Sequence, residues 1–172
     1  MKKIKIVVAG PYGAGKTRFI NTASEIETVS TEVDLPDQTG DKKTTTVAMD
    51  YGRLTISEDI ELNMFGTPGQ DRLGFMWEIL SLGMKGLVFV VDSNDEKALT
   101  EAARMLPHFS KKVPVVVAAN KQDQADPTSV ETIRKRLSID ESVPVIPCAA
   151  IEKESVLNVL ETLTDLLDAV AV

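Results

Sequence analysis

Residues 10–17 read Gly-Pro-Tyr-Gly-Ala-Gly-Lys-Thr, and this stretch decides how the rest of the chain is interpreted. It follows a short apolar run at residues 3–9 and opens a segment with helical spacing at residues 16–27. Two glycines separated by four residues and followed by Lys-Thr are typical of a phosphate-binding loop when a strand precedes them and a helix follows. Glycines let backbone N–H groups converge on an anion, and the N-terminus of the next helix adds positive potential. The stretch therefore predicts a phosphate-binding loop of the P-loop class.

The side chains of this loop have the chemistry that a nucleoside triphosphate requires. We expect Lys16 to reach the terminal phosphates and the Thr17 hydroxyl to coordinate Mg²⁺. The alternative is an ordinary glycine turn, but such a match arises by chance in roughly one chain in a hundred or fewer. The residues expected at the phosphates are Gly10, Tyr12, Gly13, Ala14, Gly15, Lys16, Thr17 and Arg18.

Short β-branched runs alternate with segments of helical spacing, which predicts an α/β fold. Two strands, at residues 47–56 and 60–65, are joined by a short hairpin loop and must be antiparallel. Residues 28–43 lack periodicity and are expected to form a long mobile loop. The sequence thus predicts one domain over residues 1–172, with a six-stranded, mostly parallel sheet, one antiparallel strand and helices on both faces. The other expected strands are 3–9, 87–92, 113–119 and 143–147, and the expected helices are 16–27, 72–82, 96–108, 130–137 and a C-terminal helix that begins near residue 156.

Composition narrows the classes of function. A net charge of -7 and a pI near 4.8 argue against nucleic-acid binding, which needs clustered Lys and Arg. One cysteine, Cys148, and one histidine, His108, cannot form a disulfide, a zinc cluster or a Cys/His catalytic pair. This composition fits a reducing cytosol, so we expect a cytoplasmic protein. The sequence has neither a run of ~20 apolar residues nor an acylation or prenylation signal, so no intrinsic membrane anchor is expected.

A second motif stands at the ends of two predicted strands. Residues 120–123 read Asn-Lys-Gln-Asp, and residues 148–150 read Cys-Ala-Ala. Open α/β sheets bind ligands at the carboxyl ends of their strands. The Asp123 carboxylate can accept hydrogen bonds from the N1–H and N2–H₂ groups of guanine, a pair of donors that adenine lacks. The alternative is a surface turn shaped by Asn120 and Asp123; because the same chain also has a phosphate loop, we expect Asp123 to select guanine.

With both motifs in one chain, the sequence resembles the small Ras-like GTPase superfamily over nearly its whole length. Residues 86–95 and 119–123 are most similar to the Arf branch. Residues 44–52 and 65–70 are similar instead to prokaryotic relatives that include the gliding-motility GTPase MglA. We favour the prokaryotic branch, since the chain starts without an amphipathic N-terminal helix. The resemblance implies a P-loop small G-domain that binds GTP or GDP with Mg²⁺.

The resemblance also implies roles for individual residues around the base. The backbone N–H of Ala149 should contact guanine O6, Lys121 should pack along the base, and Asn120 should brace the phosphate loop. Cys148 occupies a position where Ser is common and is expected to be a small structural residue. Cys148 and Ala150 complete the expected nucleotide-binding set.

In this family a Thr before the second strand and a Gly-Gln pair after the third strand sense the γ-phosphate. By resemblance these are Thr46, which would complete the Mg²⁺ coordination, Gly69, which would donate its N–H to the γ-phosphate, and Gln70, which would orient the attacking water. Thr44 and Thr45 are alternative candidates for this Mg²⁺ ligand. The three consecutive Thr residues could also be present only because Thr favours β-strands. The expected catalytic residues are therefore Gln70, Lys16 and Thr46.

One departure from the family pattern concerns the metal. Gly66 stands where the family has an Asp that holds the waters of Mg²⁺. If the hairpin turn is centred on Glu58, then Asp50 faces Gly66, and the missing carboxylate has moved one strand over. The alternative is that Asp50 is a solvent-facing strand residue. The same register pairs Ile56 with Ile60, Leu54 with Leu62 and Gly52 with Met64.

Two features suggest slow chemistry. Tyr12 is bulky at a loop position that is Gly in many relatives, and only Lys42 and Lys43, not Arg, precede Thr46. We therefore expect a GTP/GDP switch with slow hydrolysis that a partner accelerates. GTPase-activating and effector proteins are the expected partners, and family resemblance suggests a roadblock-type one. The alternatives are a hydrolysis-deficient, nucleotide-bound scaffold and a P-loop ATPase or kinase, against which Asp123 stands.

Overall fold

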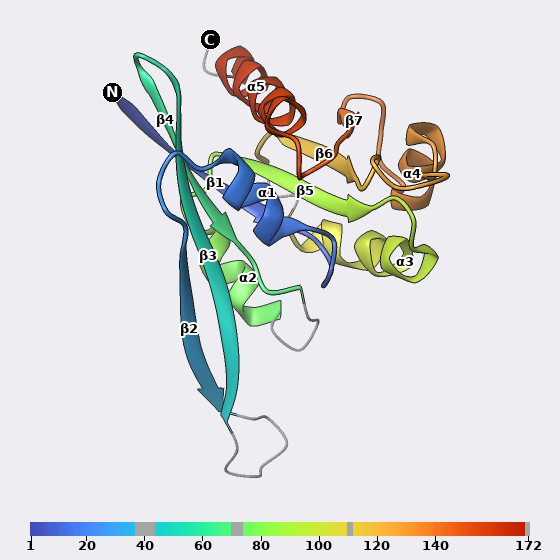
Figure 1. Cartoon of the computed structure of the whole chain (residues 1–172), viewed down its shortest axis with the longest axis horizontal. Coiled ribbons are helices and arrows are strands. Elements are labelled where there is room, and N and C mark those ends of the chain that lie inside the picture. Colours follow the sequence, from blue (N-terminus) through green and yellow to red (C-terminus); the bar gives the residue numbers. More distant parts are fainter. Residues whose placement is uncertain (37–43, 70–73, 110–111, 171–172) are drawn as a thin grey trace.

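The structure, a computed structural model, describes residues 1–36, 44–69, 74–109 and 112–170. Within these residues it contains a seven-stranded sheet in the order β2-β3-β4-β1-β5-β6-β7 (Figure 1). In chain order the elements are β1 (Lys2–Ala9), α1 (Lys16–Ala23), β2 (Val29–Pro36), β3 (Thr44–Ser57), β4 (Ile60–Gly66), α2 (Gly74–Ser81), β5 (Gly86–Asp92), α3 (Glu96–Met105), η2 (Leu106–His108), β6 (Val115–Asn120), α4 (Val130–Leu137), β7 (Val145–Pro147) and α5 (Lys153–Val170). The predicted α/β architecture is confirmed.

Among the strands of the described residues, β3 alone runs antiparallel to the rest of the sheet, as predicted, because it pairs antiparallel with both β2 and β4 while the other neighbouring strands pair in parallel. The count of six strands was wrong. Residues 29–36 are not part of a loop but form β2, which pairs with β3 from Val29 opposite Tyr51 to Pro36 opposite Thr44. Residues 37–43 lie outside the described residues.

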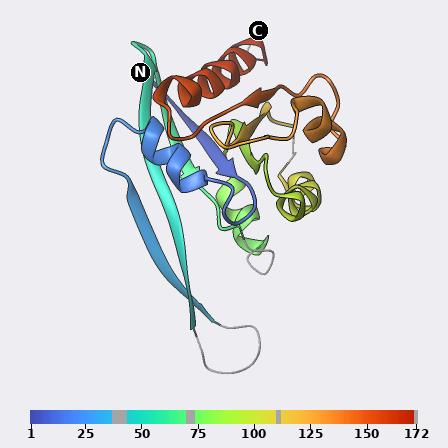
Figure 2. The ribbon, with the colours of Figure 1, turned by 45° about the vertical axis from the view of Figure 1, so that its right-hand side comes forward.

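Strand β2 forms because the edge of β3 offers unpaired backbone groups and the segment can satisfy them. Its sequence places β-branched or apolar residues at every second position, namely Val29, Thr31, Val33 and Leu35. That alternation is a strand signal. The β2–β3 hairpin extends well beyond the rest of the sheet (Figure 2).

The hairpin between β3 and β4 fixes which residues face one another. Gly52 pairs with Met64 and Leu54 with Leu62, as predicted. The predicted pair of Ile56 and Ile60 is wrong, because Ser57 pairs with Ile60 and the register shifts between Thr55 and Ser57. The extra residue is a bulge beside the turn, where such irregularities are common. It leaves the register toward the phosphate loop unchanged.

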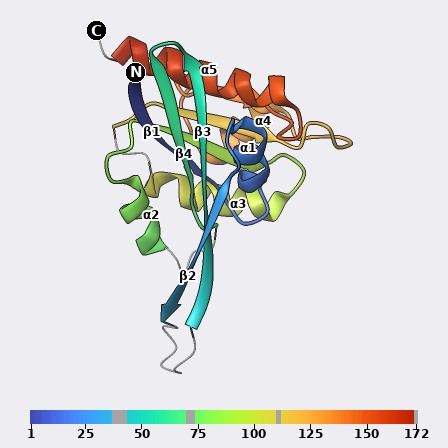
Figure 3. The same cartoon turned by 60° about the vertical axis from the view of Figure 1, so that its left-hand side comes forward.

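Two apolar cores cover the two faces of the sheet. One core lies under α1 and α5 and includes Ile6, Phe19, Leu62, Leu160 and Leu163. The other lies under α2, α3 and α4 and includes Val7, Trp77, Phe89, Leu99 and Ile133. Figure 3 shows α1 and α2 on opposite sides of β1, β3 and β4. The predicted helices on both faces are confirmed.

Helix α5 buries one side along the sheet, through Val156, Val159, Leu160 and Leu163. Its last turn leaves the core, since Val170 is 71% exposed. Among the described residues, no helix combines the length and the apolarity needed to cross a bilayer.

Removing a buried side chain from α5 tests this packing. Leu163→Ala should lower the free energy of unfolding by about 3 kcal/mol, because the side chain is fully buried and leaves a cavity. Leu82→Ala is the matched control, since Leu82 is 71% exposed and its truncation should change stability by less than about 0.5 kcal/mol. Urea denaturation followed by circular dichroism measures both. Equal losses would contradict the assignment of the core.

Candidate nucleotide-binding site

The loop between β1 and α1 has a backbone that only glycine allows at two close contacts. Gly10 (φ 149°) and Gly15 (φ 106°) both have positive φ. A Cβ atom on Gly10 would lie 2.1 Å from the Val90 carbonyl oxygen, and one on Gly15 would lie 2.2 Å from Asn120 Nδ2. Helix α1 begins at Lys16 with no side chain capping its N-terminus. The loop therefore sits against β5 and β6 and presents an uncapped helix N-terminus, as an anion site requires.

Lys16 lies inside this loop and is only 9% exposed. Its Nζ donates to the carbonyl oxygens of Gly10 (2.6 Å) and Pro11 (2.8 Å). Burial lowers the pKa of the Lys16 ammonium to about 8, and the charge of Asp50 opposes that shift only in part. The ammonium is thus short of negative charge, which a phosphate group would supply.

Beside the loop, Thr17 contacts Asp50 of β3. The Thr17 hydroxyl donates to Asp50 Oδ2 (2.6 Å), and the Ser30 hydroxyl of β2 donates to Asp50 Oδ1 (2.7 Å). A Cβ atom on Gly66 would lie 3.3 Å from Asp50 Cβ and 2.9 Å from Ile20 Cδ1. Asp50 therefore occupies the space beside Gly66, as the hairpin register predicted.

This donor set suits Mg²⁺. The described residues contain no group of three or more His, Cys, Asp or Glu side chains that could enclose a metal. Mg²⁺ commonly takes one or two protein ligands and fills its shell with waters and phosphate oxygens. A hydroxyl has one proton and two lone pairs, so Thr17 can keep donating to Asp50 while a lone pair faces a cation.

Asn120 joins three segments at the carboxyl edge of the sheet. Its Nδ2 donates to the Ala14 carbonyl oxygen (2.9 Å), and its Oδ1 accepts from the Ala150 N–H (2.9 Å). The buried Asn120 therefore links the phosphate loop to the segments after β6 and β7, which is the bracing arrangement expected from the family.

The residues expected around the base gather at the same edge. Burial raises the pKa of the Cys148 thiol, and the charge of Asp123 adds to the effect, which places the exposed Asp123 carboxylate near this loop. Cys148 is fully buried, in accordance with a structural role. The Ala149 N–H donates to Ser155 Oγ (2.9 Å), and Lys121 Nζ donates to Asp92 Oδ2 (2.6 Å).

Sequence reasoning missed Asp92 and Ser155. Asp92 could have been found, because it ends β5 directly opposite Asn120, and residues that end neighbouring parallel strands share one edge of the sheet. Ser155 had no comparable signal, because its contact depends on how α5 approaches the loop before it.

Gly69 of the expected Gly-Gln pair lies against the phosphate loop. A Cβ atom on Gly69 would lie 2.3 Å from the Tyr12 backbone nitrogen, so only glycine fits here. The Tyr12 side chain is 77% exposed. Gln70, like Lys42 and Lys43, lies outside the described residues.

Thr46 is in β3, where its backbone pairs with Asp34 of β2. Its side chain, like those of Thr44 and Thr45, is outside what the structure describes. A strand advances about 3.3 Å per residue, so the Thr46 backbone lies roughly 13 Å along β3 from Asp50. The structure therefore brings Asp50 to Thr17, whereas Thr46 lies farther along the hairpin.

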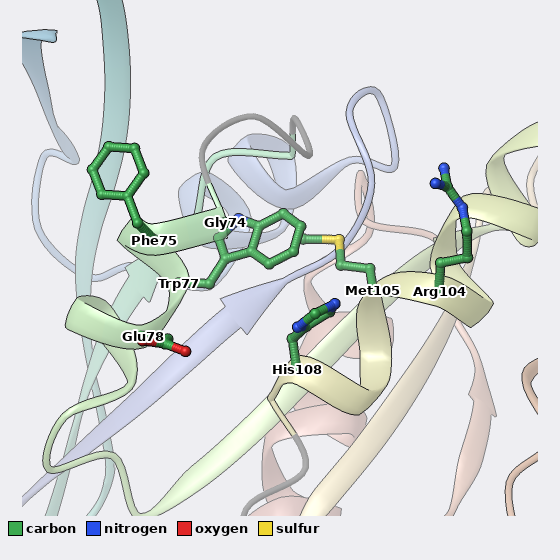
Figure 4. Close-up of a pocket in the computed structure, with 7 residues that line it drawn as sticks. All are labelled: Gly74, Phe75, Trp77, Glu78, Arg104, Met105 and His108. Carbon is green, nitrogen blue, oxygen red and sulfur yellow. The ribbon is translucent and has the colours of Figure 1, made fainter. Parts of the chain in front are cut away.

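Residues 67–69 are tied to α2 as well. Trp77 Nε1 donates to the Pro68 carbonyl oxygen (2.7 Å), and the Trp77 ring stacks at a tilt on Phe109 with ring centroids 5.3 Å apart. A groove of about 500 Å³ runs beside this ring, and Figure 4 shows the indole reaching from α2 toward Met105 and His108. Its lining comprises Gly74, Phe75, Trp77, Glu78, Arg104, Met105 and His108.

Comparison with known proteins agrees with this geometry. The sequence model of the ADP-ribosylation factor family matches residues 1–167. The chain belongs to the ADP-ribosylation factor family. It is similar to ADP-ribosylation factor-like protein 3 of Saccharomyces cerevisiae, with 28% identity over 171 residues that cover 93% of this chain and 83% of that protein. An ADP-ribosylation factor-like protein 3 of Caenorhabditis elegans is 29% identical over 164 residues, covering 90% and 83%.

An uncharacterized protein of Methanocaldococcus jannaschii is 36% identical over 134 residues, which cover 73% of this chain and 76% of that protein. Membership of the family confirms the expected small Ras-like P-loop GTPase with Arf-like features, and the protein is a GTP-binding molecular switch of the GTPase type. The narrower assignment to the MglA-like branch stays a prediction.

Lys16 should change its protonation when this switch binds nucleotide. Without nucleotide its pKa is about 8, so the amine loses its proton as the pH rises above that value, whereas bound phosphate restores the ammonium. GDP binding should take up almost no proton near pH 7 and approach one proton near pH 9. Affinity should fall by up to about tenfold per pH unit above the pKa. Calorimetry in two buffers of different ionisation enthalpy measures the uptake.

Lys16→Met is the control for this measurement. It has no amine at this position and should show only the smaller uptake that comes from the guanine ring itself. If the two proteins took up the same number of protons, Lys16 would not be the titrating group.

Proposed function

We propose that the whole chain, residues 1–172, acts as a single G domain that cycles between GTP and GDP and hydrolyses GTP slowly unless a partner assists. The observation that carries this proposal is the link made by Asn120 between the phosphate loop and the loop after β7. Through it, the groups expected to hold phosphate and the groups expected to read guanine lie at one edge of the sheet. An ATPase or kinase has no use for Asp123 at that place.

Hydrolysis would add water to the γ-phosphate and release GDP and phosphate. Lys16 would stabilise the charge on the phosphate oxygens, and Gln70 would orient the attacking water. Gly69 is already against the Tyr12 backbone and would turn its N–H to the γ-phosphate. Charge neutralisation at the β- and γ-phosphates is the chemistry that a bound Mg²⁺ supplies.

Switching follows from the distance between Thr46 and Asp50. For Thr46 to join Thr17 at a cation, the far part of the β2–β3 hairpin must rearrange, because the Thr46 backbone is paired with Asp34. A γ-phosphate could stabilise that rearranged state, and its release would return the hairpin to the paired state. The difference between the two states is what a partner would detect.

Slow unaided turnover is supported by the loop side chains. Tyr12 stands at the mouth of the site with an exposed ring, and the segment before Thr46 contains no Arg to stabilise the transition state. An activating protein would therefore supply a positive charge to the transition state or hold Gln70 in its productive position. A roadblock-type partner and a cytoplasmic location remain part of this proposal by family resemblance and composition.

The rate of a single turnover tests the proposal. Pure protein loaded with GTP should release phosphate at about 10⁻³ s⁻¹ or more slowly, as expected for a small GTPase without its activator. Gln70→Leu should be slower again, because the water loses its orienting group. Phosphate-sensor fluorescence measures release, and GTP but not ATP should displace bound GDP.

A second candidate, a nucleotide-bound scaffold without turnover, is favoured by the exposed Tyr12 and by Gly66. It predicts that GTP binds tightly and that the wild-type protein and Gln70→Leu release phosphate equally slowly. Failure to bind guanine nucleotides at all would overturn both candidates.

We also propose that Asp50 replaces the carboxylate missing at position 66 and holds waters of the Mg²⁺ ion. The support is the 2.6 Å contact with Thr17 and the lack of room beside Gly66. Mg²⁺ should increase the GDP affinity of the wild-type protein. In Asp50→Ala that increase should be about tenfold smaller, since the variant loses a charged group at the metal site. Titration of GDP binding with and without Mg²⁺ checks the loss, and an unchanged Mg²⁺ dependence would remove Asp50 from the site.

Returning the carboxylate from position 50 to position 66 gives a more discriminating experiment. In the double variant Asp50→Gly/Gly66→Asp, a carboxylate returns to position 66 and the Asp50 side chain no longer occupies the space beside it, so that only the end of the Ile20 side chain, 2.9 Å from the new Cβ, has to shift. Mg²⁺ dependence should recover in that protein, whereas Gly66→Asp alone should bind poorly because two carboxylates compete for one space. Melting temperatures of all variants exclude loss of folding as the cause.

A further inference from the structure

The turn that carries Asp123 is held from outside by the segment that follows β5. The Lys121 carbonyl oxygen accepts from the Gln124 N–H (3.1 Å), which closes a turn around residues 122 and 123. Asn94 Nδ2 donates to the same carbonyl (3.1 Å) and to Gln124 Oε1 (3.3 Å). The position of Asp123 therefore depends on contacts made by Asn94.

Lys121 itself has an uncommon backbone, with φ of 67°. A non-glycine residue in this left-handed region is strained and persists only where its surroundings hold it, which often happens at ligand sites. Here the side chain is held as well, because Lys121 Nζ pairs with Asp92 Oδ2 at 2.6 Å. The side chain and the carbonyl of the strained residue are thus both held by residues 92–94 at the end of β5.

Asp92 is well suited to this task. The residue is 8% exposed and ends β5, whose neighbour β6 ends at Asn120. Its second carboxylate oxygen, Oδ1, accepts from the Asn94 N–H (2.9 Å), which fixes the carboxylate plane and places Asn94 next to the Lys121 carbonyl. One short segment therefore orients both the side chain and the carbonyl of Lys121.

We propose that Asp92 and Asn94 are positioning residues for guanine recognition, acting through Lys121 and the turn that contains Asp123. This inference rests on the proposed guanine-nucleotide function. Lys121 can lay its apolar stem along the base only if its ammonium is held beyond the edge of the ring, and Asp92 holds it there. Neither Asp92 nor Asn94 needs to touch the nucleotide.

The consequence is kinetic. Loosening Lys121 and the turn leaves the phosphate contacts in place and weakens the grip on the base, so bound nucleotide should leave faster while association changes little. Asp92→Asn, which keeps the shape of the side chain and removes its charge, should speed GDP release by about tenfold. Asn94→Ala should speed it by about threefold. Stopped-flow release of a fluorescent GDP analogue from the full-length protein measures both.

Asp95→Asn is the matched control on the same segment. The Asp95 carboxylate caps α3 by accepting from the N–H groups of Lys97 and Ala98, a task that Asn performs equally well. It should leave GDP release unchanged. Since Asn94 is exposed, Asn94→Ala folds even if the buried Asp92→Asn does not, and it then decides the question.

Measurements in two variant backgrounds distinguish an effect of Asp92 on the position of Lys121 from a general structural effect. In a Lys121→Met background, Asp92→Asn should add less than about twofold, because its route of action is already removed. In an Asp123→Asn background, which should bind xanthosine diphosphate, Asp92→Asn should speed release of that ligand by the same tenfold, since Asp92 does not read the edge of the base.

The outcomes are distinguishable. Unchanged GDP release in both Asp92→Asn and Asn94→Ala would overturn the inference and leave the proposed function intact. A full tenfold effect of Asp92→Asn in the Lys121→Met background would also overturn it. A wild-type protein that binds no guanine nucleotide would instead overturn the proposed function.

Discussion

A buried ammonium is the constraint on which the rest of this site depends. Lys16 lies within the phosphate loop with two backbone carbonyls as its hydrogen-bond partners, and burial lowers its pKa to about 8. The loop can enclose it only because Gly10 and Gly15 allow the backbone to approach Val90 and Asn120. A group that is short of negative charge, in a loop whose next helix has no side-chain cap, fits a polyphosphate better than it fits any neutral ligand.

In the proposed Mg²⁺ site, the acidic side chain comes from a different strand than in the family pattern. Gly66 has no carboxylate, and the space beside it is taken by Asp50 from the neighbouring antiparallel strand. A strand-to-strand exchange of this kind preserves the charge near Thr17 while changing the element that carries it. Because β3 also carries Thr46 and pairs with β2, the carboxylate and the expected γ-phosphate sensor now belong to the same hairpin. Movement of that hairpin would therefore affect both at once.

Features of the fold and the site could be predicted from the sequence when they depended on residues close together in the chain. The phosphate loop and the guanine motif were predictable because each is a short run with a fixed chemical role. Even the meeting of Asp50 and Gly66 followed from the alternation of the hairpin. Strand β2 was not predicted, because Asp34, Pro36 and Asp37 are typical of loops and outweighed the alternation of β-branched and apolar residues. The segment forms a strand because it pairs with the edge of β3. The Asp92–Lys121 pair arises from packing between segments that are distant in the chain, which no local pattern encodes. The bulge at Ile56 and the contact of Ser155 with Ala149 are closer in the chain, but they depend on the exact geometry of the hairpin and of the start of α5.

The contacts within the site divide into those that a nucleotide must replace and those that it can keep. If Lys16 binds phosphate and the Ala149 N–H meets guanine O6, as expected, Lys16 must first leave its backbone carbonyls and the Ala149 N–H must leave Ser155. For these two groups, binding exchanges one hydrogen bond for another, so the net gain is small unless the new partner is charged. Thr17 and Lys121 differ, because Thr17 keeps a lone pair free while donating to Asp50, and Lys121 offers its stem while its ammonium stays with Asp92. Under the proposed function, the affinity at the phosphate end would therefore arise mainly from charge that the nucleotide brings, whereas at the base end Lys121 would contribute order that the protein already has. The residues that supply this order without contacting the ligand, Asp92 and Asn94 in our proposal, would then control how long the nucleotide stays bound.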